Sequence, residues 1–164
     1  MGTRLGRGRN VALVPARVAH YRGRMPEIRY DESGFGAEDF LALVRRVWPR
    51  DYDAARVAAA VARTENVGAW DGARLVGAVR VLSDGYLFAA VSEILVDPEY
   101  QGRGIGRELM RRALARAPRG RLFLGAQPHS VGFFERLGYR RGPVGFVAER
   151  PGSDGRPGAD ARAT

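Results

Sequence analysis

The stretch "VDPEYQGRGIGREL", Val96 to Leu109, places three glycines within five residues, between an apolar strand-like segment and a helix-like segment. A strand that ends in a glycine-rich turn and opens a helix leaves several backbone N–H groups unpaired at the positive end of the helix dipole. Glycine has no Cβ that would keep a ligand away from these amides. Arg103 and Arg107 add positive charge at the rim. The stretch therefore predicts a binding site for an anion, above all a diphosphate.

Two common nucleotide-binding motifs do not match this stretch. The dinucleotide fingerprint requires G-x-G-x-x-G after a first strand, whereas Gly102, Gly104 and Gly106 are spaced G-x-G-x-G. The Walker motif is absent too, because no Gly-Lys-Ser/Thr follows the glycines. Both nucleotide-binding families are therefore excluded.

The composition limits the chemistry that the chain can perform. A chain of 164 residues is long enough for one domain with one substantial core. It has no cysteine, which excludes disulfides, zinc–thiolate sites and thiol nucleophiles. No apolar run approaches the roughly 20 residues of a membrane-spanning helix, and "VALVPARVA" is a poor signal peptide because Pro15 and Arg17 interrupt it. We expect a cytoplasmic protein with no membrane partner and no metal site.

The formal net charge of +9 is unevenly distributed along the chain. Residues 1–25 carry six arginines and no carboxylate, and the charges of the Gly/Pro-rich segment 151–164 cancel. We expect a basic flexible leader at 1–25, a single domain over 26–150 and a disordered tail at 151–164. A nucleic-acid partner is disfavoured because most of the basicity lies in the leader, although an arm that binds phosphate backbones is the alternative interpretation of that segment.

Hydrophobic periodicity predicts an α/β fold, in more detail an α+β mixed sheet with helices on both faces. A short strand near 27–30 precedes a helix with apolar positions from Phe40 to Trp48, and a second helix at 53–64 with Asp51 or Asp53 as its cap. Asp71-Gly72 and Ser83-Asp84-Gly85 then separate three strands of an antiparallel meander.

After the glycine stretch, the pattern predicts an amphipathic helix from Ile105 that ends before Pro118 and carries Leu114 on its apolar face. A buried strand follows at 121–126, then a short helix with Ser130 as N-cap and Gly138 as its end, and a final strand pair through Val147. The predicted order is β-α-α-β-β-β-α-β-α-β-β.

The glycine stretch resembles motif A of the GNAT family of N-acetyltransferases, whose [QR]-x-x-G-x-[GA] pattern is met by Gln101, Gly104 and Gly106. "SVGFFERLGYR", about two dozen residues later, resembles motif B of that family, and the resemblance covers most of Ile28 to Glu149. The chain is also loosely similar to the plant and bacterial serotonin-type acetyltransferases. The resemblance implies a GNAT-like acyl-CoA N-acyltransferase fold with acetyl-CoA as the cofactor.

The resemblance also implies where acetyl-CoA binds. Its diphosphate would lie on the amides of the glycine stretch, and its pantetheine would pair with the exposed edge of the strand that ends at Val96. A backbone N–H near Leu95 or Val96 would polarise the thioester carbonyl. The implied cofactor-binding residues are Leu95, Val96, Gln101, Gly102, Arg103, Gly104, Ile105, Gly106, Arg107, Gln127 and Ser130; for Ser130, helix capping explains the residue equally well.

An alkylamine acceptor is only about one part in two thousand neutral at pH 7, so the site needs a proton acceptor. Glu93 lies on the strand where the family often places a base that works through a water. An ion pair with Arg80 across the meander explains Glu93 equally well, and both interpretations stay open. Alternation places Ser92 and Glu93 on opposite faces unless a β-bulge changes the parity.

Many members of the family use a motif B tyrosine to protonate the departing thiolate, and this chain has Phe134 there. A coenzyme thiolate is a good leaving group, so water alone is one alternative. Tyr139, Ser130 and His129 are weaker substitutes for the missing tyrosine, and of these we assign Tyr139 as a second catalytic residue.

Aromatic residues beside carboxylates suit a cationic acceptor. In the family the loop between the first two helices borders the acceptor cleft, and here it carries Trp48 and Tyr52 beside Asp51 and Asp53. Asp84 and Tyr86 in the second turn are further candidates. The alternative interpretation is structural, with Trp48 in the core and Asp51 as helix cap.

The sequence therefore predicts an enzyme that moves the acetyl group of acetyl-CoA to a primary amine, in a small molecule rather than a protein, by direct attack in a ternary complex. A protein lysine or N-terminal acetyltransferase and a non-catalytic CoA-binding or nucleic-acid-binding module are the alternatives. Whether the chain forms a homodimer stays open.

Overall fold

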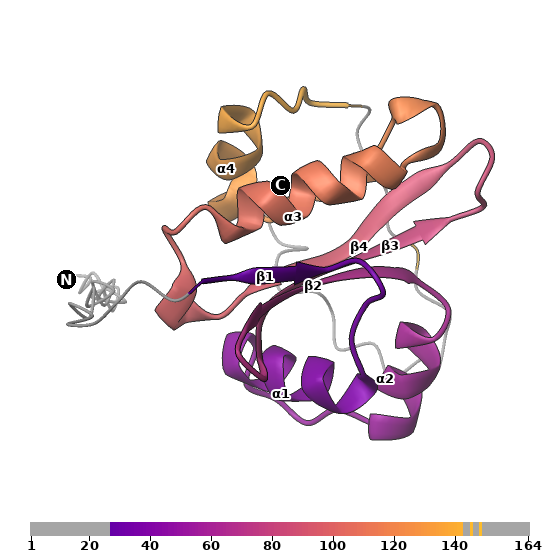
Figure 1. Cartoon of the computed structure of the whole chain (residues 1–164). Coiled ribbons are helices and arrows are strands. Elements are labelled where there is room, and N and C mark those ends of the chain that lie inside the picture. Colours follow the sequence, from indigo (N-terminus) through magenta and orange to yellow (C-terminus); the bar gives the residue numbers. More distant parts are fainter. Residues whose placement is uncertain (1–26, 143–144, 146–147, 149–164) are drawn as a thin grey trace, which may run out of the picture. The chain divides into compact units, whose positions relative to one another are not determined.

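The computed structural model of the chain describes residues 27–142, 145 and 148 (Figure 1). The predicted leader, the predicted tail and the predicted final strand pair through Val147 lie outside these residues, so the domain boundaries at 26 and 150 stay a prediction. Two compact units adjoin in the sequence between Leu122 and Phe123.

The first unit contains the elements that the sequence predicts up to the helix after the glycine stretch. They are β1 (Arg29–Asp31), α1 (Ala37–Val47), α2 (Ala54–Val61), β2 (Glu65–Asp71), β3 (Arg74–Ser83), β4 (Ala89–Val96), a 3₁₀ turn (Pro98–Tyr100), α3 (Ile105–Arg116) and a second 3₁₀ turn (Pro118–Gly120). The second helix is shorter than predicted, and Asp53 is its N-cap because its carboxylate accepts the Arg56 N–H.

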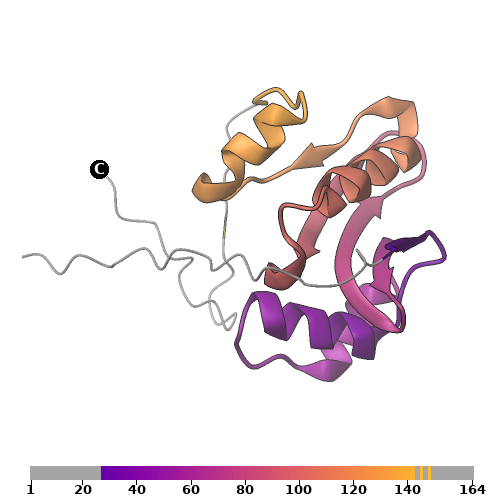
Figure 2. The ribbon, with the colours of Figure 1, turned by 60° about the vertical axis from the view of Figure 1, so that its left-hand side comes forward.

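The strands of the first unit form an antiparallel meander in the order β1, β2, β3, β4. Asp71 pairs with Arg74 across the first turn, and Gly72 adopts a positive φ of 57° there, as a tight Asp-Gly hairpin requires. Helices α1 and α2 cover one face of this sheet and α3 covers the other (Figures 1 and 2). The prediction of helices on both faces is confirmed for this unit.

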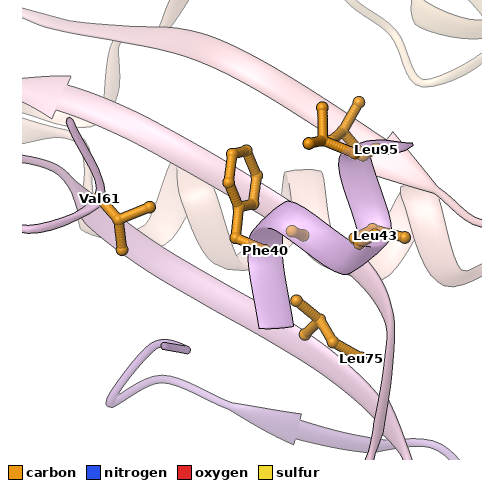
Figure 3. Close-up of a cluster of buried hydrophobic side chains, with 7 residues drawn as sticks. Phe40, Leu43, Val61, Leu75 and Leu95 are labelled. Carbon is orange, nitrogen blue, oxygen red and sulfur yellow. The ribbon is translucent and has the colours of Figure 1, made fainter. Parts of the chain in front are cut away.

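One hydrophobic cluster lies between α1, α2 and the sheet (Figure 3). It contains Phe40, Leu43, Val44, Val61, Leu75, Ala78 and Leu95.

Two residues that the sequence predicted on apolar faces, Trp48 and Leu114, are exposed instead. Trp48 lies just beyond the end of α1, where the helical periodicity that placed it on the apolar stripe no longer applies. Leu114 lies in the last turn of α3, whose buried residues are Ile105, Leu109, Met110 and Ala113.

Helix α3 packs closely on β3 because Gly77 has no side chain. A Cβ at this position would stand 2.9 Å from Ile105 Cγ2, 3.1 Å from Leu109 Cδ1 and 3.3 Å from Ala69 Cβ. Ile105 and Leu109 are themselves fully buried, so they have little freedom to move away. The distance between α3 and the sheet is therefore set at Gly77.

The second unit contains β5 (Phe123–Leu124), a 3₁₀ turn (Pro128–Ser130) and α4 (Val131–Arg136). The predicted buried strand at 121–126 is wrong in length, and Phe123 is 40% exposed. Ser130 is the N-cap residue of α4, but its hydroxyl donates to the Gln127 carbonyl at 2.9 Å and caps no helix amide. Gly138 ends the helix with a φ of 82°, as predicted.

Within 27–142, 145 and 148, no helix combines the length and the apolar character that crossing a membrane requires. The same part of the chain holds no group of three or more histidine, aspartate or glutamate side chains that could bind a metal ion.

Replacing Gly77 by valine should destabilise the fold. Valine is favourable in a strand, so a loss of stability reports the collision with Ile105 and Leu109 and not strand propensity. We expect the free energy of unfolding to fall by about 1–3 kcal/mol in urea denaturation. Gly125→Val is the matched control, because a Cβ there meets nothing within 4 Å. Equal losses in both variants would contradict the close packing at Gly77.

Candidate active site

The loop between β4 and α3 exposes backbone amides at the start of a helix. Gly102 and Gly104 have positive φ angles of 76° and 81°, and Gly104 is the N-cap of α3. The first-turn amides of Ile105, Gly106 and Arg107 have no acceptor within the helix. A Cβ built on Gly102 or Gly104 meets nothing within 4 Å, so space is open beside the loop. The loop therefore fits the diphosphate of a coenzyme, which needs both donors and room.

Arginines surround this loop. The Arg103 guanidinium lies 4.9 Å from the centre of the Tyr100 ring and donates to the Glu99 carbonyl at 2.9 Å. Arg107 is exposed in the first turn of α3. Tyr100 is anchored in turn, because its hydroxyl donates to Asp71 at 2.6 Å, and this hydrogen bond, with burial, raises the pKa of Tyr100. The cations thus stand on an ordered loop.

Asp97 is the most buried ionisable group of the loop, with 1% exposure. Its Oδ2 accepts from Arg46 Nε of α1 at 2.6 Å and from Arg74 Nη2 of β3 at 2.8 Å, and its Oδ1 accepts the Glu99 N–H at 3.1 Å. Burial alone would raise the pKa of Asp97, but the hydrogen bonds from Arg46, the Glu99 amide and Arg74 outweigh burial and lower it. Asp97 is therefore an ionised carboxylate at neutral pH.

Gln101, a predicted cofactor residue, contacts the end of β4. Its side-chain amide Nε2 donates to the Val96 carbonyl at 3.2 Å. A pantetheine that paired with this carbonyl would share it with Gln101, because a carbonyl oxygen has two lone pairs. Leu95, the neighbouring candidate, has its side chain buried in the hydrophobic cluster, so only its backbone is left for a ligand.

A β-bulge lies in the middle of β4. Glu93 pairs with Arg80 of β3 and Val91 pairs with Val81, so Ser92 is the extra residue. In a regular strand Val91 and Glu93, two residues apart, would point to the same face of the sheet. The bulge changes this alternation, so Glu93 lies opposite Arg80 and Val91 lies opposite Val81, and these two neighbours point to different faces of β3. Sequence alternation could not locate this bulge.

Glu93 is paired with Arg80. Arg80 Nη1 donates to Glu93 Oε2 at 2.9 Å, and the side chains are 8% and 29% exposed, respectively. The guanidinium also lies 5.3 Å from the Phe40 ring centre and donates through Nε to Thr64 Oγ1 at 3.2 Å. The predicted ion pair is thus confirmed, and a catalytic role for Glu93 stays a prediction.

The candidate acceptor residues after α1 lie near the outer end of the helix. Trp48 is 42% exposed, which contradicts its alternative interpretation as a core residue. Tyr52 is half-buried against the hydrophobic cluster, and its hydroxyl donates to the Trp48 carbonyl at 3.0 Å. Arg50 lies 4.9 Å from the Tyr52 ring centre, so a cation already occupies one approach to this ring.

Asp84, a candidate acceptor residue, stabilises the turn between β3 and β4 in which it lies. Asp84 Oδ1 accepts the backbone N–H groups of Tyr86, Leu87 and Phe88 at 2.8–2.9 Å. These hydrogen bonds lower the pKa of Asp84. Tyr86 is 80% exposed. The ordering of the turn accounts for Asp84 without an acceptor, and a contact with one stays a prediction.

The structure does not bring the two sets of acceptor candidates together. Arg46 of α1 binds Asp97, which directly follows β4. Trp48, just after α1, therefore lies near the C-terminal end of β4. The turn with Asp84 and Tyr86 precedes the other end of β4, and the 8 residues of the strand span about 25 Å. One small acceptor cannot contact both sets.

Three predicted site residues belong to the second unit. Gln127 is exposed and receives two hydrogen bonds from Ser130 on its carbonyl oxygen. Tyr139 is half-buried, with its ring edge-to-face with Phe134 at 6.0 Å between centres. Burial raises the pKa of Tyr139, so its phenol keeps its proton at neutral pH.

Sequence reasoning missed Asp97, Arg46 and Arg74. The signal that could have found Asp97 is its position directly after the strand and before Pro98, where an aspartate caps a turn. Nothing local indicates its arginine partners, which lie 51 and 23 residues earlier in the chain.

Comparisons with known proteins identify the family of the chain. A family model described as an acetyltransferase (GNAT) domain matches residues 30–149. A soybean protein named probable acetyltransferase TAP2 is 31% identical over 140 residues, covering 76% of this chain and 56% of the relative. The rice protein named serotonin N-acetyltransferase 2, chloroplastic, is 38% identical over 74 residues, covering 43% of this chain and 36% of the relative. The chain thus spans about half the length, or less, of the curated relatives that it matches.

Solved structures show the same fold. A GNAT family acetyltransferase from Streptococcus pneumoniae superposes with a TM-score of 0.64 at 26% identity, covering 76% of this chain and 98% of that one. AAC(6')-Iy in complex with a CoA-containing bisubstrate analog has a TM-score of 0.58 at 17% identity, covering 76% of this chain and 97% of that one. This second likeness concerns the fold alone. The family match, these neighbours and the α/β architecture together show that the chain belongs to the GNAT family of acetyltransferases.

Proposed function

We propose that the chain is an acetyl-CoA-dependent N-acetyltransferase that acetylates a primary amine of a small molecule. The observation that carries the proposal is the β4–α3 loop, where two glycines with positive φ and the first turn of α3 offer backbone donors beside open space. Family membership supports acetyl transfer as the reaction, and the acceptor is inferred from the exposed Trp48 and the half-buried Tyr52 after α1.

Residues of the loop would hold the coenzyme. The amides of the first turn of α3 and the Arg107 side chain would bind the diphosphate, and Arg103 would add charge from its position beside Tyr100. The coenzyme would supply an acetyl group activated as a thioester. The backbone of β4 near Leu95 and Val96 would orient this group and donate to its carbonyl.

Glu93 would take the proton that the amine must lose. Arg80 holds one of its oxygens, Oε2, and the side chain is 29% exposed, so water can reach the carboxylate. No hydrogen bond to Oε1 comes from the described residues, which leaves this oxygen available for a bridging water. Arg80 thus fixes the orientation of Glu93, and Tyr139, which keeps its phenolic proton, is the candidate donor to the thiolate.

A protein acceptor is the second candidate. A soybean relative, 37% identical over 76 residues, is named histone acetyltransferase TAP1. The exposed ring of Trp48 would suit either an aromatic amine or a peptide side chain. The cytoplasmic location, the absence of a nucleic-acid partner and the oligomeric state stay predictions.

An acceptor screen tests the proposal directly. Purified protein is incubated with acetyl-CoA and with arylalkylamines, polyamines, aminoglycosides or lysine peptides, and thiol release is followed. We expect turnover with at least one small amine, and turnover with lysine peptides alone would favour the second candidate. If calorimetry shows no binding of acetyl-CoA to folded protein, the proposal is wrong.

Glu93→Gln should lower kcat at least tenfold, because the amide cannot accept the proton. The Gln carbonyl can still accept from Arg80 but no longer neutralises this buried guanidinium, so the melting temperature should fall. The Kd for acetyl-CoA should change little, because Glu93 lies outside the loop that would bind the diphosphate. Glu65→Gln, which alters an exposed carboxylate on β2, is the matched control and should keep full turnover. Unchanged turnover in Glu93→Gln removes Glu93 as the base.

Gly104→Ala should weaken acetyl-CoA binding at least tenfold. The added Cβ projects into the space that the diphosphate would use, and alanine is strained at a φ of 81°. Gly85→Ala separates these effects, since Gly85 has a φ of 76° and similarly open surroundings but lies in the β3–β4 turn. We expect similar losses of stability in both variants and a weaker Kd only in Gly104→Ala. Equal Kd values would place the diphosphate elsewhere.

A further inference from the structure

We propose that Asp97 is a positioning residue for coenzyme binding, which ties the β4–α3 loop to α1 and β3 through Arg46 and Arg74. The inference rests on the proposed function, because it assigns the coenzyme to this loop. Asp97 itself would touch neither the coenzyme nor the acceptor, since its carboxylate is buried behind the loop. Its effect would be exerted through the backbone that follows it.

The contacts of Asp97 fix both the end of β4 and the beginning of the loop. Its N–H donates to the Val76 carbonyl at 2.9 Å, which extends the β3–β4 pairing by one residue. Its carbonyl accepts the Tyr100 N–H at 2.8 Å, and its Oδ1 accepts the Glu99 N–H at 3.1 Å. The 3₁₀ turn Pro98–Tyr100 is therefore built on Asp97.

Two arginines from other elements hold the carboxylate in place. Arg46 binds Asp97 Oδ2 and, through Nη2, the Leu75 carbonyl at 2.6 Å, so it joins α1, β3 and the loop. Arg74 binds Asp97 Oδ2 and also Glu99 at 3.0 Å. A pair of this kind with one buried partner resists displacement, because separating it leaves a buried charge uncompensated.

The positioning extends from Asp97 to the glycines by a series of short contacts. Tyr100, at the end of the 3₁₀ turn, is anchored on Asp71 at 2.6 Å. Arg103 donates back to the Glu99 carbonyl, one residue before Tyr100. Gly104, the N-cap of α3, follows directly. If Asp97 shifts, the amides from Gly102 to Arg107 are no longer held in one fixed orientation. Binding of an anion by several amides depends on their mutual orientation, so coenzyme binding should weaken.

Asp97→Asn is the variant that tests this role. It keeps an acceptor for the Glu99 N–H but removes the charge and directs an NH₂ group at two guanidinium donors. We expect the Kd for acetyl-CoA, measured by calorimetry well below the melting temperature, to rise at least tenfold. At saturating acetyl-CoA, kcat should stay within about twofold of wild type, because the reacting groups are unchanged.

A second readout needs no coenzyme. In coenzyme-free protein, amide hydrogen exchange over residues 99–107 should be faster in Asp97→Asn than in wild type. Val61→Ala is the control, because it removes side-chain volume from the hydrophobic cluster on α2 and destabilises the fold without touching the loop. We expect it to lower the melting temperature but to leave the Kd and the loop exchange unchanged.

Arg74→Gln is the milder variant if Asp97→Asn does not fold, since the Arg74 side chain is partly exposed. It should weaken acetyl-CoA binding about threefold to fivefold, and Arg74→Lys should recover part of this loss. Arg29→Gln, at an exposed ion pair on β1, is the control and should cause no loss.

Wild-type Kd and wild-type loop exchange in Asp97→Asn, or in Arg74→Gln if it replaces Asp97→Asn, would overturn the inference. Absence of acetyl-CoA binding by wild type would instead overturn the proposed function, and faster exchange in Asp97→Asn would then still support Asp97 as the residue that orders this loop.

Discussion

A buried carboxylate must be neutralised, and this requirement organises the first unit around Asp97. Removing a lone carboxylate from water is far too costly for a protein of ordinary stability, so the chain has to bring cations to it. Those cations come from α1 and β3, which are distant in the sequence. Meeting the requirement brings α1, the start of β3 and the exit of β4 together, and thereby defines where the glycine loop begins.

The same principle operates a second time within the sheet, with the signs reversed. Arg80 is the buried ion there, and Glu93 is the partner that remains partly accessible. The Arg80 guanidinium is further supported by the Phe40 ring and the Thr64 hydroxyl, so its position does not depend on Glu93 alone. Glu93 is accordingly both a structural partner and a group that solvent can reach. The two interpretations of Glu93 are therefore compatible, since an ion pair on one carboxylate oxygen leaves the other oxygen for proton transfer.

The sequence predicted what depends on local chemistry and missed what depends on distant partners. The Asp71-Gly72 turn, the helix stop at Gly138 and the amphipathic α3 follow from neighbours within a few residues, and all are present. The bulge at Ser92 has no local signal, because the segment Val91 to Glu93 fits the regular alternation of side chains along a strand. Only the register with β3 shows that Ser92 is an extra residue. In the same way, the sequence predicted that Asp84 contacts a cationic acceptor but did not indicate that its Oδ1 accepts three amides of its own turn. A carboxylate in a turn satisfies the backbone first, and sequence alone does not show whether any capacity remains.

The absence of a side chain at Gly77 has a consequence for the chemistry of the loop. Helix α3 begins at Ile105, which lies directly over Gly77, so the separation of helix and sheet at this point also fixes the height of the helix N-terminus. A methyl group there would stand 2.9 Å from Ile105 Cγ2, so the first turn of α3 and its donors would have to shift relative to the strand edge. The residue at position 77 would then affect both coenzyme affinity and the alignment of an acyl group with β4, although no ligand could contact it.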